Sequence, residues 1–152
     1  LLEAEQPQDR PDRAEPSAAP FPELMGARVL LAEDNAINRQ VANEILQSSG
    51  VSVEPAGDGL EAVEKLWEGG YDAVLMDIQM PKMDGYKATQ AIRNLPDEDK
   101  ASIPIVAMTA NAFEEDKRDA IAAGMNGHIA KPIQVDKMLS ILSEVIRQQE
   151  NY

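Results

Sequence analysis

Acidic side chains directly follow two short apolar runs of the chain. Glu33 and Asp34 come after the run 29–32, and Asp77 comes after the run 73–76. Two carboxylates about 4 Å apart repel by roughly 4 kcal/mol at an effective dielectric constant of 20, so three acids that meet must bind a cation or take up protons. Mg²⁺ prefers carboxylate, carbonyl and water oxygens and leaves positions open for phosphate oxygens. The three acids are therefore candidate magnesium ligands.

Two further side chains at the ends of apolar runs suit phosphoryl transfer. Thr109 follows the run 105–108, and Lys131 follows the run 128–130. A carboxylate can attack phosphorus to give an aspartyl phosphate when a metal, an ammonium group and hydrogen-bond donors neutralise the transferring group. Lys131 and Thr109 are the candidate donors.

Each of these residues also has a simpler interpretation. Glu33 and Asp34 could cap a following helix, where acids interact favourably with the helix dipole. Lys131 could be a solvated surface lysine, and Thr109 alone is only a threonine at the end of a strand. The repetition of the pattern at four apolar runs favours the chemical interpretation.

The elements that would position these residues alternate along the chain from residue 28 onward. Short apolar runs alternate five times with segments of helical period, which is typical of βαβ units and a parallel sheet. The carboxyl ends of parallel strands meet at one edge of such a sheet. We therefore expect one shallow pocket to be faced by Glu33, Asp34, Asp77, Thr109 and Lys131.

Five helices are predicted from apolar spacing and from capping residues. Asn35 would cap the first, and Asp58 has capping-box spacing to Glu61 at the start of the second. The segment 113–123 has the weakest apolar face. The faces expected for the other four helices are Ile37, Val41 and Ile45; Leu60, Val63, Leu66 and Trp67; Ala88, Ala91, Ile92 and Leu95; and Val135, Met138, Leu139, Leu142, Val145 and Ile146.

The composition limits the class of protein. A chain of 152 residues is long enough for one domain with a proper core. Its 27 acidic and 14 basic residues give a net charge of −13, which argues against binding to nucleic acid or anionic lipid. The lack of cysteine excludes disulfides and thiolate sites, and no apolar run approaches the roughly 18 residues of a membrane span. We expect a cytoplasmic domain.

The first part of the chain differs from the rest. Its prolines are scattered among Ala, Gln, Arg and acidic residues with little apolar periodicity, so it cannot bury enough surface to offset its ordering entropy. We predict that residues 1–25 are a disordered linker rich in Pro, Ala and acids, and that 26–149 form the domain. The linker would be an interdomain tether, or else an arbitrary chain end. The leading leucine predicts a piece of a longer protein.

Taken together, four motifs of this chain resemble those of the response-regulator receiver family. The resemblance covers residues 28–148, and its wording is most similar to receivers fused to histidine kinases. The motifs are LLAEDN at 30–35, MDIQMPKMDG at 76–85, MTANA at 108–112 and KP at 131–132. The resemblance implies an α/β fold, a doubly wound (βα)₅ parallel sheet with the flavodoxin-like order 2-1-3-4-5.

The resemblance also implies roles for the residues at the strand ends. Asp77 would be the phosphoacceptor. Mg²⁺ would be held directly by Asp34 and Asp77, mainly through water by Glu33, and by the backbone carbonyl of Gln79. Lys131 would pair with a phosphoryl oxygen.

The resemblance implies that a second group of residues controls the conformational switch and the lifetime of the phosphoryl group. Thr109 would donate its hydroxyl to the phosphoryl group and shift the population towards an active arrangement. Receivers usually have Tyr or Phe three residues before the lysine, and His128 stands there as either a switch ring or a merely packed side chain. Gln79 and Asn111 resemble positions that tune hydrolysis of the phosphoryl group. The pair Lys131-Pro132 resembles a cis-proline turn.

The function implied is that of a two-component phosphorelay receiver. It would accept a phosphoryl group from a kinase phosphohistidine, expected in the same polypeptide, and switch or relay it to a histidine phosphotransfer partner. The receiver would phosphorylate and dephosphorylate itself rather than turn over a substrate. The parent protein would be a hybrid sensor histidine kinase, which could be anchored in the inner membrane. A weak homodimer of the receiver is a further alternative.

Two other functions are compatible with the fold. A pseudo-receiver would keep the fold as a binding module without the chemistry, but the full set of acids, threonine and lysine argues against this. An aspartate-nucleophile phosphatase or nucleotide-binding enzyme is disfavoured because Gln79 takes the second place of an Asp-x-Asp pair, and because neither a P-loop nor a Gly-x-Gly-x-x-Gly turn is present.

Overall fold

The fold is a parallel sheet covered by helices on both faces. The computed structural model describes residues 21–110, 114–131 and 133–150. Five parallel strands lie in the order β2-β1-β3-β4-β5, which confirms the predicted fold class. The strands are β1 (Arg28–Ala32), β2 (Ser52–Ala56), β3 (Ala73–Asp77), β4 (Ile105–Thr109) and β5 (Gly127–Ala130).

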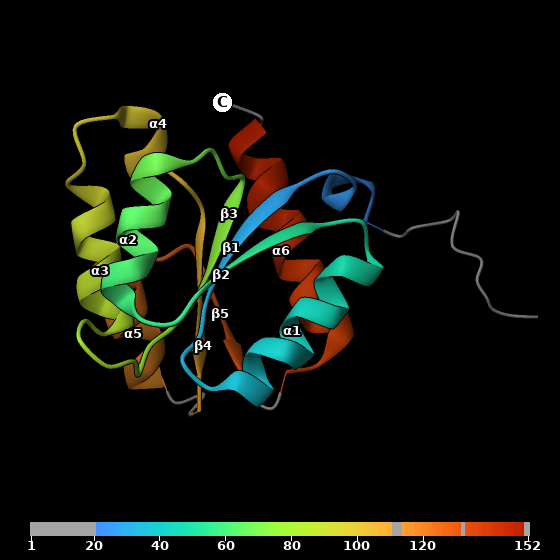
Figure 1. The fold of residues 1–152 in the computed structure, drawn as a ribbon, viewed down its shortest axis with the longest axis horizontal. Helices are drawn as coiled ribbons and strands as arrows, with labels where there is room; N and C mark the ends of the chain where they lie inside the picture. The colour runs from blue at the N-terminus through green and yellow to red at the C-terminus, as the bar shows by residue number, and fades with distance from the viewer. Residues whose placement is uncertain (1–20, 111–113, 132, 151–152) are drawn as a thin grey trace, which may run out of the picture.

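Two layers of helices enclose the sheet (Figure 1). Apolar residues of α1 and α6 pack on one face, and those of α2, α3 and α5 pack on the other. The helices are α1 (Ala36–Ser48), α2 (Gly59–Glu68), α3 (Gly85–Arg93), α4 (Glu98–Ala101), α5 (Glu114–Ala123) and α6 (Val135–Glu150). Because helices cover both faces, every residue of β3 and β4 is buried, as expected for central strands of a parallel sheet.

The inward face of α1 differs from the prediction. Ile37 and Val41 were expected to face the core, but they are 73% and 43% exposed. The residues that pack on the sheet are Ala42 and Leu46, which are fully buried. Ile45, the third residue of the predicted face, is partly buried and packs against the same core. Ala42 has a short side chain, so the helix can approach the sheet closely, and Ile37 and Val41 lie outside.

A similar correction applies to α2. Leu60 and Trp67 are exposed, whereas Ala62 and Leu66 are buried against the sheet. The Trp67 ring lies beneath the ammonium of Lys100, 5.1 Å from the ring centre, and Lys100 also donates to the Trp67 carbonyl. The predicted stripe of α6 is buried from Met138 onward, and only its first member, Val135, is exposed.

The predicted helix caps are present. Asn35 Oδ1 accepts from the Asn38 amide at 3.0 Å, and Asp58 Oδ1 accepts from the Glu61 amide at 2.8 Å. Glu61 accepts from Gly57 N at 2.7 Å rather than from the cap residue itself, so the second bond of the capping box falls one residue earlier than in the usual motif.

The short helix α4 was not predicted. Asp97 caps it by accepting from the amides of Asp99 and Lys100 at 3.0 and 3.2 Å. A single turn is too short to show an apolar period, so only the cap residue could have indicated it.

Arg93 at the end of α3 joins three segments of the chain. Its guanidinium donates to Gly124 O from Nε at 2.9 Å and from Nη2 at 2.7 Å. Nη1 donates to Ala101 O and Ile103 O, both at 2.7 Å, and Nη2 donates to Asn126 Oδ1 at 2.8 Å. Burial lowers the pKa of this guanidinium. The side chain thus ties the ends of α4 and α5 to the strands that follow them.

Replacing Arg93 by Met should destabilise the domain by about 3 kcal/mol, because several part-buried oxygens would lose their donors while the apolar stem is kept. Urea unfolding would measure the change. Arg147→Met is the control, since Arg147 is exposed and pairs with Glu144 on the surface of α6. Equal stability of the two variants would contradict the prediction.

Thr89 of α3 carries an unsatisfied polar atom. It is fully buried, and its Oγ1 has no hydrogen-bond partner among the described residues. Because a buried hydroxyl without a partner is costly, we expect Thr89→Val, which has nearly the same shape, to raise the free energy of unfolding by about 1 kcal/mol. Thr89→Ser keeps the hydroxyl and loses the methyl group, so its midpoint in urea should fall. A lower midpoint for Thr89→Val would disprove the interpretation.

The free edge of β2 is partly closed. Pro55 lies in this edge strand and has no N–H to offer. Lys65 of α2 donates to the Pro55 carbonyl and forms ion pairs with Glu54 at 3.0 Å and Glu61 at 3.2 Å. This cluster therefore covers an acceptor that an edge strand would otherwise leave open.

The packed chain includes a turn before β1. A 3₁₀ turn, η1, spans Pro22–Leu24, and Leu24 is fully buried in the core beside α6. Packing therefore begins upstream of the predicted domain start at residue 26. The predicted linker lies outside the described residues up to residue 20. Within the described part of the chain, no helix is long and apolar enough to span a membrane.

Candidate functional site

The five predicted site residues meet at the carboxyl edge of the sheet. Asp77 and Thr109 are the last residues of β3 and β4, and Glu33 and Lys131 each stand one residue beyond a strand, β1 and β5 respectively. The register pairs Asp77 with Met108 and Thr109 with Ala130, so these ends are level. A cavity of about 410 Å³ is lined by all five, Asp34 included.

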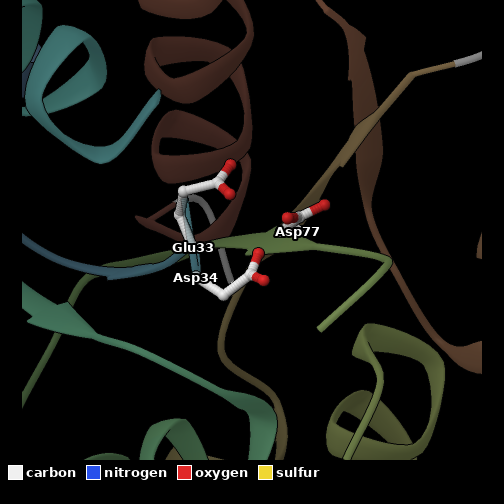
Figure 2. A group of neighbouring side chains, drawn as sticks. All are labelled: Glu33, Asp34 and Asp77. Atoms are coloured by element: carbon white, nitrogen blue, oxygen red, sulfur yellow. The ribbon is translucent and has the colours of Figure 1, made fainter. Parts of the chain in front are cut away.

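Three carboxyl groups surround one space in this pocket. Glu33 and Asp34 approach from the end of β1 and Asp77 from the end of β3 (Figure 2). One oxygen from each of the three lies within 4.8 Å of the other two. Glu33 and Asp77 are buried, at 1% and 4% exposure, whereas Asp34 is exposed. The site therefore has two oxygen donors held inside the protein and one at the surface.

Lys131 is the cation of the site. Its Nζ lies 2.9 Å from Glu33 Oε1 and 3.3 Å from Asp77 Oδ2. Burial alone would lower the pKa of this ammonium, but the two carboxylates outweigh it and raise the pKa. Lys131 therefore stays charged at neutral pH, close to the oxygen atoms of Asp77.

Asp77 is under electrostatic stress without a metal. Burial and the neighbouring Glu33 raise its pKa from 3.8 to about 7, although Lys131 acts in the opposite direction. One lysine thus does not neutralise the two buried acids fully. A divalent cation would do so, because it adds two positive charges among the same oxygens.

The donor set fits a hard divalent ion. Carboxylate oxygens are what Mg²⁺ prefers, and an exposed side of the site leaves room for water and phosphate oxygens. Glu33 Oε1 is buried and, among the described residues, has no hydrogen bond of good geometry despite the ion pair with Lys131. Beside the Lys131 ammonium, this oxygen can also face a cation or its bound water.

The loop after Asp77 is fixed by close backbone contacts. Gly85 N donates to Ile78 O at 2.8 Å, and a Cβ at Gly85 would lie 2.4 Å from the Asp77 carbonyl oxygen. Within the loop, Met83 N donates to Pro81 O at 2.6 Å, a tight turn that places Lys82 at φ 66°. The position of Gln79 in this loop is therefore strongly constrained.

Gln79 lies beside the proposed phosphoacceptor. Its backbone N–H donates to Asp77 Oδ1 at 3.3 Å. The residue is exposed and lines the acid pocket. A Cβ at Gly59 would lie 2.1 Å from Met83 O, so the start of α2 also presses on this loop. Only glycine allows that approach, because any larger residue would push the loop away.

Among the further residues that line the pocket, three polar ones lie outside the motifs quoted from the sequence. They are Asn38 of α1, Tyr86 of α3 and Asp119 of α5. Asn38 lies one helical turn after the cap Asn35, so the spacing in the sequence could have placed it beside the pocket. Asp119 could not have been placed, because α5 has too weak an apolar face to fix which side points inward.

The remaining predicted positions are only partly described. His128 of β5 is half-buried and lines a separate cavity of about 860 Å³ between β5, α5 and α6, which also contacts Lys131. Its role as a switch ring stays a prediction. Asn111 and Pro132 lie outside the described residues, and so do the predicted lifetime role of Asn111 and the cis-proline turn.

The fold and the pocket define a class of protein, and comparison with known proteins agrees with it. The family model described as "Response regulator receiver domain" matches residues 29–143. The chain belongs to this family.

Several curated relatives of the chain are histidine kinases of far greater length. Hybrid signal transduction histidine kinase B of Dictyostelium discoideum is 38% identical over 149 residues, which is 92% of this chain and 7% of that protein. Sensor histidine kinase RcsC of Escherichia coli is 34% identical over 126 residues, which is 81% of this chain and 13% of that protein. The chain therefore spans only a small part of these relatives.

Solved structures share both the fold and the sequence pattern. The receiver domain of sensor histidine kinase PA1611 from Pseudomonas aeruginosa, described with a magnesium ion in its active site cleft, is 40% identical with a TM-score of 0.74, covering 80% of this chain and 98% of that one. A complex of the Saccharomyces cerevisiae phosphotransfer protein Ypd1 with the receiver of Ssk1 matches at 31% identity and a TM-score of 0.76, covering 82% and 92%.

Proposed function

We propose that this receiver accepts a phosphoryl group on Asp77 from a kinase phosphohistidine and relays it to a histidine phosphotransfer partner. One observation carries the proposal: the Asp77 carboxyl group lies in one pocket with two further acids and with Lys131 Nζ at 3.3 Å. An ionised acid buried in this way is unfavourable unless a cation neutralises it. Magnesium in the cleft of the relative from Pseudomonas aeruginosa supports the same use of the pocket.

The chemistry follows from the residues. An ionised oxygen of Asp77 attacks phosphorus, the O–P bond forms, and the N–P bond to the donor histidine breaks, with the electron pair and then a proton going to the imidazole nitrogen. Lys131 would neutralise one phosphoryl oxygen, and Thr109 would donate its hydroxyl to another. Attack by water on the aspartyl phosphate later returns inorganic phosphate and Asp77.

Mg²⁺ would be held by Asp34, Asp77 and the carbonyl of Gln79, with Glu33 acting mainly through bound water. When bound, the ion supplies positive charge to the transferring phosphoryl group and keeps Asp77 ionised. This is favourable because the raised pKa of Asp77 otherwise leaves the carboxyl group partly protonated near neutral pH.

Further roles at the rim are proposed on the same basis. Thr109 would move towards the phosphoryl group and His128 would follow it, which would change the surface formed by α5, β5 and α6. Gln79 and Asn111 would tune the lifetime of the aspartyl phosphate by limiting the approach of water.

Incubation with acetyl phosphate and Mg²⁺ tests the function. The mass of the intact chain should increase by one phosphoryl group, the increase should require Mg²⁺, and beryllofluoride should bind only when Mg²⁺ is present. A chain that ignores all three reagents would instead be a binding module with the receiver fold.

The larger context is also proposed. We infer a cytoplasmic domain that includes the turn at Pro22–Leu24 and is joined through the preceding residues of the predicted linker 1–25 to a hybrid sensor histidine kinase. The kinase domain would lie in the same polypeptide, and an anchor in the inner membrane would lie elsewhere in that protein. The chain itself would contact neither membrane nor nucleic acid, in keeping with its net charge of −13. It would act as a self-phosphorylating and self-dephosphorylating switch, and a weak homodimer is compatible with this role.

The apolar surface of α1 is proposed as the place where the phosphotransfer partner docks. Ile37 and Val41 are exposed one helical turn apart, on a helix that begins two residues after Asp34. Val135 is exposed at the start of α6, which covers the same face of the sheet. A partner seated on these side chains could bring its histidine to the acid pocket.

Changing Ile37 to Ser should weaken phosphotransfer from a partner and leave phosphorylation by acetyl phosphate unchanged. We expect the KM for a candidate phosphotransfer protein to rise about tenfold, because exposed apolar residues at the centre of an interface contribute roughly 1 kcal/mol or more. Ile121→Ser is the matched control, since Ile121 is 71% exposed and Ile37 is 73% exposed, but Ile121 lies on α5. Equal KM values for the two variants would place the docking surface elsewhere.

A further inference from the structure

Arg39 of α1 donates a hydrogen bond to the turn between β1 and α1, which carries Glu33 and Asp34. Its Nη1 donates to the Glu33 carbonyl oxygen at 2.8 Å, and its own amide donates to Asn35 O at 2.9 Å. The other polar groups of Glu33 are held as well: its N–H donates to Ala56 O at 3.0 Å, and its Oε2 accepts from the Asn35 amide at 3.0 Å. Arg39 is the side chain that holds the Glu33 carbonyl oxygen in this turn.

The Glu33 carbonyl oxygen is tied by the peptide plane to the position of the Asp34 Cα. A peptide unit is planar, so the Glu33 carbonyl, the Asp34 amide and the Asp34 Cα share one plane. The Asp34 side chain is exposed and makes no hydrogen bond or ion pair within the described part of the chain. The backbone therefore sets the position from which this side chain reaches into the pocket, and the backbone at this point is held by Arg39.

We propose that Arg39 is a positioning residue for the divalent cation. By fixing the peptide between Glu33 and Asp34, it holds the Asp34 carboxylate within reach of Asp77 before the metal arrives. The inference rests on the proposed function, because it takes Asp34 as a ligand of Mg²⁺. Partners that orient metal ligands typically change metal affinity 10- to 100-fold when they are removed.

Charge and positioning predict opposite results at this residue. Arg39 is a cation close to a cation site, so removing its charge alone would strengthen Mg²⁺ binding, since the repulsion between like charges is lost. Loss of positioning would weaken Mg²⁺ binding. The sign of the change therefore separates the two roles, and a residue needed only for stability would move the melting temperature without moving the affinity.

Calorimetric titration of the whole 152-residue chain with Mg²⁺ tests the proposal. We expect Arg39→Met to bind Mg²⁺ about tenfold more weakly and Arg39→Lys, which keeps a donor and the charge, to remain within about threefold of the unaltered chain. Arg147→Met is the matched control, because it loses the same charge from an exposed position near the far end of α6, and its affinity should not weaken. With acetyl phosphate, Arg39→Met should need more Mg²⁺ for half-maximal rate and reach the same rate at saturation.

Unchanged or tighter Mg²⁺ binding by folded Arg39→Met would overturn the inference while leaving the proposed function intact. If that variant does not fold in metal-free buffer, Arg39→Gln replaces it, and the same two results decide. Failure of the unaltered chain to bind Mg²⁺ at all would refute the proposed function itself.

Discussion

Asp77→Asn should abolish phosphorylation of the chain by acetyl phosphate in Mg²⁺, a loss of more than about 1,000-fold. The amide has nearly the same size as the carboxyl group but has no ionised oxygen with which to attack phosphorus. Asp77 is buried, and its Oδ2 lies 3.3 Å from Lys131 Nζ. Mass spectrometry of the intact protein would measure the labelled fraction over time.

The control for this experiment is Asp99→Asn, an exposed acid of α4, which should be labelled at the rate of the unaltered chain. A melting curve of Asp77→Asn would verify that it is folded. Labelling of Asp77→Asn at the normal rate would mean that a different side chain, such as Asp34, accepts the phosphoryl group. The assignment of the phosphoacceptor would then be wrong, although the site itself would survive.

Without a metal, the free energy of unfolding should fall as the pH rises from about 4 to about 7. Burial and Glu33 raise the pKa of Asp77 from 3.8 to about 7 in the folded chain. Between these values the folded state holds a proton that the unfolded state has already released, so raising the pH favours unfolding. The difference in pKa sets an upper limit of about 4 kcal/mol, and above pH 7 this contribution no longer changes.

Urea unfolding in a chelator at several pH values would measure this dependence. Other acids titrate in the same range, so the informative quantity is the difference between the unaltered chain and Asp77→Asn. The variant should become relatively more stable as the pH rises through the window. Mg²⁺ at pH 8 should stabilise the unaltered chain, because it binds the folded form, and should stabilise the variant less. Parallel curves for the two proteins would show that Asp77 ionises normally.

The position of the site could be predicted from the sequence because strand ends are easily recognised. Each apolar run ends at a polar residue, and parallel topology brings those ends to one edge, so Asp77, Thr109 and Lys131 could be placed without coordinates. The caps Asn35 and Asp58 could be predicted for a similar reason, since a cap is a local hydrogen bond between residues close in the chain.

Features that depend on packing could not be predicted in the same way. Ile37 and Val41 have the correct helical spacing for a buried face, yet the sheet contacts the face with Ala42 and Leu46. Apolar identity does not decide between two such faces, because folded proteins expose many apolar atoms. The role of Arg39 likewise depends on a contact to a backbone oxygen, which leaves no pattern in the sequence.

The partly closed edge of β2 affects how the protein associates with other chains. Open strand edges are templates on which other chains can add in register, and this is how amyloid fibrils grow. Pro55 has no N–H, and Lys65 occupies the Pro55 carbonyl. A strand that adds to this edge would therefore lose the backbone hydrogen bonds at Pro55. We therefore expect concentrated solutions of the folded domain to resist fibril formation by this route, and Pro55→Val combined with Lys65→Ala to lower that resistance in a dye-binding assay.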